Sequence, residues 1–223
     1  MPGSIKIDDG SGNYTILTNA GSLGSDKTIT IPNTTGTAAL TTDVDAELLA
    51  SQTVSEGVTT EIDFSTSVTG FNHTDYSSYM VTYSNWQPTD DSRRLYGQLF
   101  EGATAFTGTY NQGGNQMGVN TNSGPNYYQK NDTSYFDVGY LLVGTDTREG
   151  VSGYIRVFPG NGSNTGSGNN IVVHSMTQGT SGLVYLMDLG VHYDAAGAND
   201  GVKFTVSSGT MASGVFCFYG YRK

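Results

Sequence analysis

Apolar and polar residues alternate along the last part of the chain in a pattern that is typical of β-strands. Val202, Phe204 and Val206 are separated by polar residues, which predicts a half-buried strand. The turn-forming residues of 207–214 follow it. From Val215 to Tyr221, apolar residues occupy both faces of the next predicted strand. We expect that strand to be covered on both faces, by the fold itself or by another subunit.

Further segments between Thr59 and Tyr193 share this pattern, and turn-rich stretches separate them. The additional predicted strands are 61–64, 79–86, 94–100, 138–143, 153–158, 171–176 and 183–193. Residues 109–134 have no long apolar run, so we expect a long loop there, and such loops are usually functional or mobile. This series of short strands without helices predicts an all-β fold, an antiparallel β-sandwich of the jelly-roll type.

The N-terminal part of the chain carries much less apolar area. Short β-like pieces are expected at 4–7, 14–18, 28–31 and 37–40, separated by Gly-, Asn- and Asp-rich turns. Such a segment cannot build a core alone, so it must pack on copies of itself or on a larger structure. The apolar residues expected to anchor the segment in this way are Ile5, Ile7, Tyr14, Ile16, Ile29 and Ile31.

A short linker helix is expected at Thr42–Ala50. Thr42 can cap its N-terminus, and Val44 and Leu48 stand four positions apart on one helical face. We therefore predict two parts, a trimeric stem at residues 1–50 that includes this helix and a β-sandwich head at residues 51–223.

Composition and charge narrow the choice of partners. Charged residues make up 13% of the chain, about half of the ~25% usual in soluble domains. With 31 Gly, 15 Tyr and 9 Phe, the chain resembles a rigid, turn-rich extracellular or virion protein. The net charge of −10 argues against nucleic acid and anionic membranes as partners. The only cysteine, Cys217, is expected to be a buried apolar residue.

The sequence shows neither the pattern of a membrane-spanning segment nor that of a signal peptide. No apolar run is long enough for membrane insertion, and the first residues lack the basic start and apolar core of a signal peptide. We therefore expect a protein that is made in the bacterial host cytoplasm and released as part of a particle.

The sequence offers little support for enzymatic or metal chemistry, so we expect no enzyme, no cofactor and no metal site. His73, His174 and His192 lie far apart, and the two in strands are interpreted as structural. The turn at 8–13 lacks the spacing of a calcium-binding loop. A glycan hydrolase would need a carboxylate pair, and no spacing pairs any two of these acids: Asp90, Asp91, Glu101, Asp132, Asp137, Asp146 and Glu149.

Binding is the better-supported kind of activity. Tyr, Gly, Ser and Asn in exposed loops contact partners widely at low entropic cost, and aromatic rings and amides suit sugars. The predicted ligand-binding residues are Trp86, Tyr110, Asn115, Tyr127, Tyr128 and Asn131. Two alternatives stay open, namely that Trp86 faces the core and that Tyr127 and Tyr128 line a subunit interface.

Several stretches resemble known virion proteins. Residues 28–41 (TITIPNTTGTAALT) are similar to a repeat near the N-terminal or collar part of many bacteriophage tail fibres. The segments 79–88, 153–158 and 201–220 resemble a module of marine and cyanobacterial phage structural proteins. The resemblance touches about a third of the chain. It implies a homotrimeric virion protein with a β-sandwich head.

Function is then expected in one of two places on the virion. As a tail-fibre-like protein, the chain would dock on other phage structural proteins through residues 1–50 and present its head to a host cell-surface glycan or receptor. The chain is much shorter than a typical tail fibre. This leaves open a capsid decoration or head fibre with a mainly stabilising role. A bacterial carbohydrate-binding module is disfavoured, because neither a signal peptide nor a catalytic partner is found in the sequence.

Overall fold

The computed structural model of the chain describes residues 4–8, 14–18, 46–64, 71, 75–101, 104–107, 110–119, 125–140, 142–159, 169–193 and 199–223. The chain divides into two compact units, Met1–Asp43 and Val44–Lys223. The predicted strands at 28–31 and 37–40 lie outside the described residues, and so do Ile29 and Ile31.

The first unit contains one antiparallel pair of strands, β1 (Ser4–Asp8) and β2 (Tyr14–Thr18). Its register pairs Ile5 with Leu17 and Lys6 with Ile16. The strands expected at 4–7 and 14–18 are thus present, whereas their anchoring role stays a prediction.

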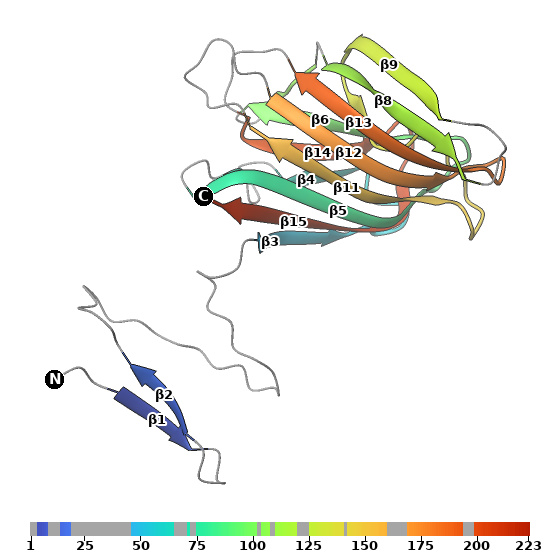
Figure 1. The fold of residues 1–223 in the computed structure, drawn as a ribbon. Coiled ribbons are helices and arrows are strands. Elements are labelled where there is room, and N and C mark those ends of the chain that lie inside the picture. Colours follow the sequence, from blue (N-terminus) through green and yellow to red (C-terminus); the bar gives the residue numbers. More distant parts are fainter. Residues whose placement is uncertain are drawn as a thin grey trace. The chain divides into compact units, whose positions relative to one another are not determined.

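The second unit contains an eight-stranded antiparallel sheet, which faces the viewer in Figure 1. Across the sheet, its strands are β3 (Ala46–Thr53), β15 (Met211–Arg222), β5 (Tyr76–Pro88), β11 (Gly150–Phe158), β12 (Asn169–Gln178), β13 (Val184–Tyr193), β8 (Tyr110–Gly118) and β9 (Asn126–Thr133). The last strand of the chain, β15, lies between β3 and β5, so the C-terminus completes this sheet.

A five-stranded antiparallel sheet lies behind the larger one (Figure 1). Its strands are β10 (Phe136–Asp137), β6 (Leu95–Glu101), β14 (Gly201–Val206) and β4 (Glu61–Phe64), with β7 (Thr104–Ala105) paired to β6.

The two sheets pack face to face through aromatic side chains. Phe64 of β4 stacks on Phe218 of β15 with ring centroids 5.2 Å apart, and Phe204 of β14 meets Phe216 of β15 at the same distance. The hydroxyl of Tyr110 on β8 accepts a 2.7 Å hydrogen bond from an amide of β6. The architecture is therefore an antiparallel β-sandwich, as the sequence predicts.

Most of the predicted strands lie within observed ones. The segments 61–64, 79–86 and 153–158 fall in β4, β5 and β11. The exception is 138–143, where Val143 makes only an isolated bridge to Arg93. Val138 and Val143 are nonetheless fully buried, so the apolar pattern there marks core side chains rather than a regular strand.

The predicted linker helix at Thr42–Ala50 is wrong. The second half of this segment is extended and starts β3, which pairs along β15, and the described residues contain no helix. One or two helical turns are unstable alone, whereas the strand satisfies its backbone on β15 and packs Leu49 and Ala50 against the core. The two units separate between Asp43 and Val44, so the predicted boundary at residue 50 falls inside a strand.

The predicted long loop at 109–134 is also wrong, because it contains β8 and β9. Its inward positions carry Gln112 and Gln116 instead of aliphatic residues, and both side chains are buried. The amide oxygen of Gln112 accepts a 2.9 Å hydrogen bond from the backbone of Asp137. A polar side chain that is hydrogen-bonded inside the fold, as Gln112 is, can therefore occupy an inward strand position without a hydrophobic pattern.

Candidate ligand-binding face

Among the described residues of the second unit, the outer face of the eight-stranded sheet is left exposed. On β15, Phe216 and Phe218 point inward and are fully buried, whereas Val215 on the opposite face is 41% exposed. Among the described residues, the fold therefore covers only one face of β15, and cover of its other face by another subunit stays a prediction.

Strand register places the outward residues of all eight strands in rows. We call the first of these the histidine row. From β3 to β9 it consists of Ser51, Cys217, Thr82, Tyr154, His174, Asp188, Asn115 and Tyr127. Each member is the direct cross-strand partner of the next, so neighbouring side chains on this face can contact one another.

A second unbroken row runs beside it, about two residues or ~6.7 Å further along the strands. We call it the arginine row. From β3 to β9 it consists of Leu48, Tyr219, Met80, Arg156, Val172, Gly190, Gly113 and Gln129. The first positions carry large side chains, whereas Gly190 and Gly113 leave bare backbone on two adjacent strands.

Neither the backbone conformation nor packing requires glycine at this pair. Neither residue has a positive φ, and a Cβ on Gly190 would meet only the carbonyl oxygen of Gly113, at 3.8 Å. A Cβ on Gly113 would lie 3.1 Å from the hydroxyl oxygen of Tyr127, at the end of a mobile side chain. Glycine inside a strand often marks a place where a ligand or another backbone approaches closely.

Tyr127 supplies an aromatic surface beside this bare backbone. Its hydroxyl lies over Gly113, and its side chain is 71% exposed. Asn115, its cross-strand partner, is also exposed. The ring and the amide are therefore both accessible to a ligand that lies on the sheet.

Further along the histidine row, Tyr154 stacks on His174 with ring centroids 5.3 Å apart. Nδ1 of His174 contacts the carboxylate of Asp188. Sequence reasoning assigned His174 only a structural role and overlooked Asp188 and Tyr154. Their position opposite the apolar core residues of the same strands is the signal that could have identified them as outward-facing.

The predicted ligand-binding residues separate into two groups. Asn115, Tyr127 and Asn131 are exposed on β8 and β9. In contrast, Trp86 and Tyr110 are 0% exposed. Buried in the core, these two cannot contact a ligand at the surface. For Trp86, the alternative that it faces the core is the one observed.

Tyr128 belongs to the interior as well, because successive residues of a strand point to opposite faces. Its hydroxyl contacts the buried carboxylate of Asp137, and its ring meets the edge of Tyr140 at 5.9 Å. Burial, followed by the hydrogen bond to Asp137, raises the pKa of Tyr128. Tyr128 therefore ties β9 to the second sheet.

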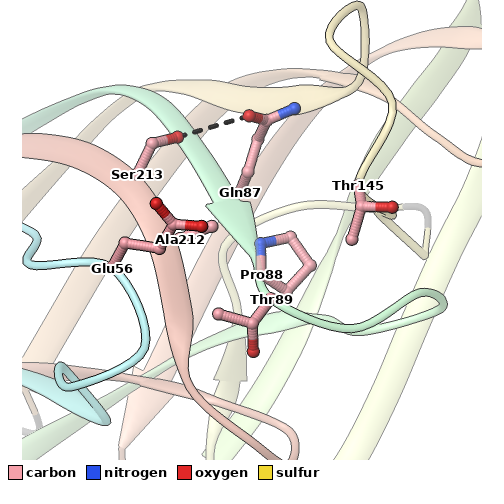
Figure 2. Close-up of a pocket in the computed structure, with 7 residues that line it drawn as sticks. All are labelled: Glu56, Gln87, Pro88, Thr89, Thr145, Ala212 and Ser213. Atoms are coloured by element: carbon pink, nitrogen blue, oxygen red, sulfur yellow. Dashed lines mark hydrogen bonds between the residues drawn. The ribbon is translucent and has the colours of Figure 1, made fainter.

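A pocket of about 550 Å³ lies at the end of β5 and the start of β15, as Figure 2 shows. Its lining residues are Glu56, Gln87, Pro88, Thr89, Thr145, Ala212 and Ser213. Most of its polar groups already bond within the protein. Gln87 donates to the carbonyl oxygens of Asp146 and Glu149, at 2.7 Å each, and Ser213 donates to Asn85 O at 2.7 Å. These bonds hold the surrounding turns together, and few groups are left for a ligand.

Two of the acids considered for hydrolysis come together near this pocket. A Cβ on Gly144 would clash with a carboxylate oxygen of both Asp91 and Glu149, so both groups lie against that glycine. Asp91 accepts hydrogen bonds from the amide and hydroxyl of Thr145, at 3.0 and 3.2 Å.

In the described ranges, no group of three or more His, Cys, Asp or Glu residues is placed to hold a metal ion.

Two further comparisons, with membrane-spanning helices and with known proteins, do not identify the function of the outer face. Within the described residues, no helix has the length and apolar character to cross a membrane. No family model, curated protein or solved structure compared with the chain matches it. Function must therefore be argued from the geometry of the outer face.

Proposed function

We propose that the protein is a virion fibre-like attachment protein whose head binds a host cell-surface glycan on the outer face of the eight-stranded sheet. The observation that carries the binding site is the exposed ring of Tyr127 lying beside the bare backbone of Gly113 and Gly190. A pyranose ring can stack on the tyrosine while its edge approaches the backbone.

The neighbouring polar groups suit the same ligand. Asn115 offers both amide donors and an acceptor, and Asp188 offers acceptors for sugar hydroxyls. The aromatic pair of Tyr154 and His174 extends the face for further sugar units. In this proposal, residues 1–50 assemble as a trimer and dock on other phage structural proteins, in line with the resemblance of residues 28–41 to tail-fibre repeats.

The first prediction tests the binding face. Tyr127→Ala should weaken binding of the full chain to host cells about tenfold, because a stacked aromatic contributes roughly 1–1.5 kcal/mol. Fluorescently labelled protein on intact cells provides the measurement, and thermal unfolding confirms that the variant is folded. The control is Tyr185→Phe. This substitution alters a half-buried tyrosine that does not lie on the outer face, so binding should be unchanged.

Two results would contradict the proposal. Binding of Tyr127→Ala equal to that of the parent would remove this face as the attachment site. A parent protein that binds no cell and no glycan would instead favour the capsid decoration alternative, in which the head serves mainly to stabilise a shell.

A further inference from the structure

Arg156 is exceptional among the arginines of this acidic chain. In the described residues, the other four arginines each have a carboxylate within 4.0 Å, and their partners are Asp90 for Arg93, Asp137 for Arg94, Asp146 for Arg148 and Glu47 for Arg222. Arg156 has none. A cation without a counter-ion is unexpected where acidic residues outnumber basic ones by 20 to 10.

The side chain of Arg156 is held in a defined position on the outer face. Its guanidinium lies over the ring of Tyr221 at 4.5 Å and over that of Phe158 at 5.2 Å. Nη2 donates a 3.1 Å hydrogen bond to the hydroxyl of Ser78. Cation–π contacts and this bond fix the plane of the group, so little entropy is lost when it binds an anion.

Most of its hydrogen-bonding capacity is unused. A guanidinium carries five N–H donors in a planar fork that matches a carboxylate, and a single side-chain hydrogen bond is found here. Nε is buried and has no partner within the described part of the chain, so the donors open to a ligand are those of the Nη groups. The carboxylate of Asp188, in the neighbouring histidine row, already contacts His174.

Arg156 also lies in line with the proposed glycan site. In the arginine row, Val172 separates it from the glycine pair, so Arg156 and Gly190 are two strand spacings or roughly 9.5 Å apart. A short oligosaccharide that stacks on Tyr127 and crosses Gly113 and Gly190 would reach Arg156 with a later unit.

We infer that the outer face binds a glycan that carries a carboxylate, such as a uronic or sialic acid, and that Arg156 is the group that recognises it. This inference rests on the proposed glycan-binding function and specifies its ligand class. The net charge of −10 does not prevent it, because charges more than about 8 Å apart are largely screened at physiological salt.

The test measures binding of matched glycans to the full chain by titration calorimetry. Oligosaccharides of glucose, galactose and mannose are each compared with the corresponding uronic acid and with its methyl ester, and sialyllactose is compared with lactose. At least one acid should bind about tenfold more tightly than its ester and its neutral match, as expected for a charge-assisted hydrogen bond.

Arg156→Gln should reduce binding of that acid to the level of the ester and leave binding of the ester unchanged. Arg156→Lys should restore only part of the difference, since an ammonium cannot bind bidentately. Arg148→Gln removes the same charge from an exposed turn and should have no effect. Thermal unfolding of each variant separates loss of recognition from loss of structure.

The possible failures are distinguishable. If neutral glycans bind in a Tyr127-dependent manner and Arg156→Gln changes nothing, the inference fails and the proposed function stands. If no acid in the panel binds more tightly than its ester, the inference fails, and if the parent protein in addition binds no host cell and no glycan, the proposed function fails with it. If Arg156→Gln instead changes the molar mass in solution, the arginine contacts another copy of the chain and the inference is overturned.

Discussion

At the residue scale, Asp137 is the most consequential charge inside the head. Its side chain is buried, contacts the hydroxyl of Tyr128, and accepts a 2.8 Å ion-paired hydrogen bond from Lys130. Arg94 approaches its second oxygen at 4.0 Å. The residue thus joins β9 of one sheet to β10 and β6 of the other.

Asp137→Asn should lower the free energy of unfolding by about 2–3 kcal/mol. Removing one member of a buried ion pair leaves the other uncompensated, and partial exposure of Lys130 moderates the loss. Denaturant unfolding provides the measurement. Asp90→Asn is the control, because its pair with Arg93 is exposed and should contribute under ~1 kcal/mol. An equal, small effect of both substitutions would contradict this role.

The types of residue along the sequence were enough to predict part of the candidate ligand-binding face. Asn115 and Tyr127 were predicted and lie side by side on the outer face. Arg156 and the glycine pair were not, since their importance comes from cross-strand neighbours far apart in sequence. Strand alternation could have separated Tyr127 from Tyr128, but only once β9 was recognised as a strand.

At the scale of elements, β3 shows how tertiary pairing overrides a local helical signal. Its eight residues lie at the edge of the large sheet and pair with β15 from Ala46 to Thr53. The apolar spacing of Val44 and Leu48 fits a helix, yet the open edge of β15 offers backbone partners along its whole length. Local propensity is a weak prior in such a setting.

A chain that begins at Val44 should keep the thermal midpoint of the head, whereas one that begins at Val54 should lose on the order of 2–3 kcal/mol of stability. The second lacks β3, and with it the burial of Leu49 and Ala50. Calorimetric melting measures the difference. Equal stability of both shortened chains would show that β3 contributes nothing to the sheet.

The strands β8 and β9 mark the limit of sequence reasoning about elements. Hydrophobic alternation predicted β4, β5 and β11 because their inward positions are apolar. In β8, buried positions carry Gln112, Gln116 and Gly118, and the signal is lost. What stabilises them is hydrogen bonding within the fold, such as that from Asp137 N to Gln112, which no local pattern reveals.

At the scale of the whole molecule, buried tyrosines set the response to alkaline pH. Burial raises the pKa of both Tyr83 and Tyr110 above the ordinary value of 10.0. In the unfolded chain these groups ionise near pH 10, whereas in the folded chain they stay neutral. Their contribution to stability is therefore complete below pH 10 and is lost as the pH rises above it.

The free energy of unfolding should fall above pH 10 by about 1 kcal/mol per pH unit for each such tyrosine. Tyr83→Phe should make that decline shallower. Below pH 10 the variant should be less stable than the parent, because it lacks the 3.3 Å hydrogen bond from the Tyr83 hydroxyl to Val138 O. Denaturant titrations between neutral and strongly alkaline pH measure both. An unchanged slope in Tyr83→Phe would contradict the assignment.

The position of β15 has a consequence for how the head is made. This strand lies between β3 and β5, which leave the ribosome long before it. Until β15 emerges, β3 lacks its partner among the described strands and β5 keeps an open edge. A product that stops before β15 would thus be left with an exposed core and unpaired strand edges, and such a product would be prone to aggregate.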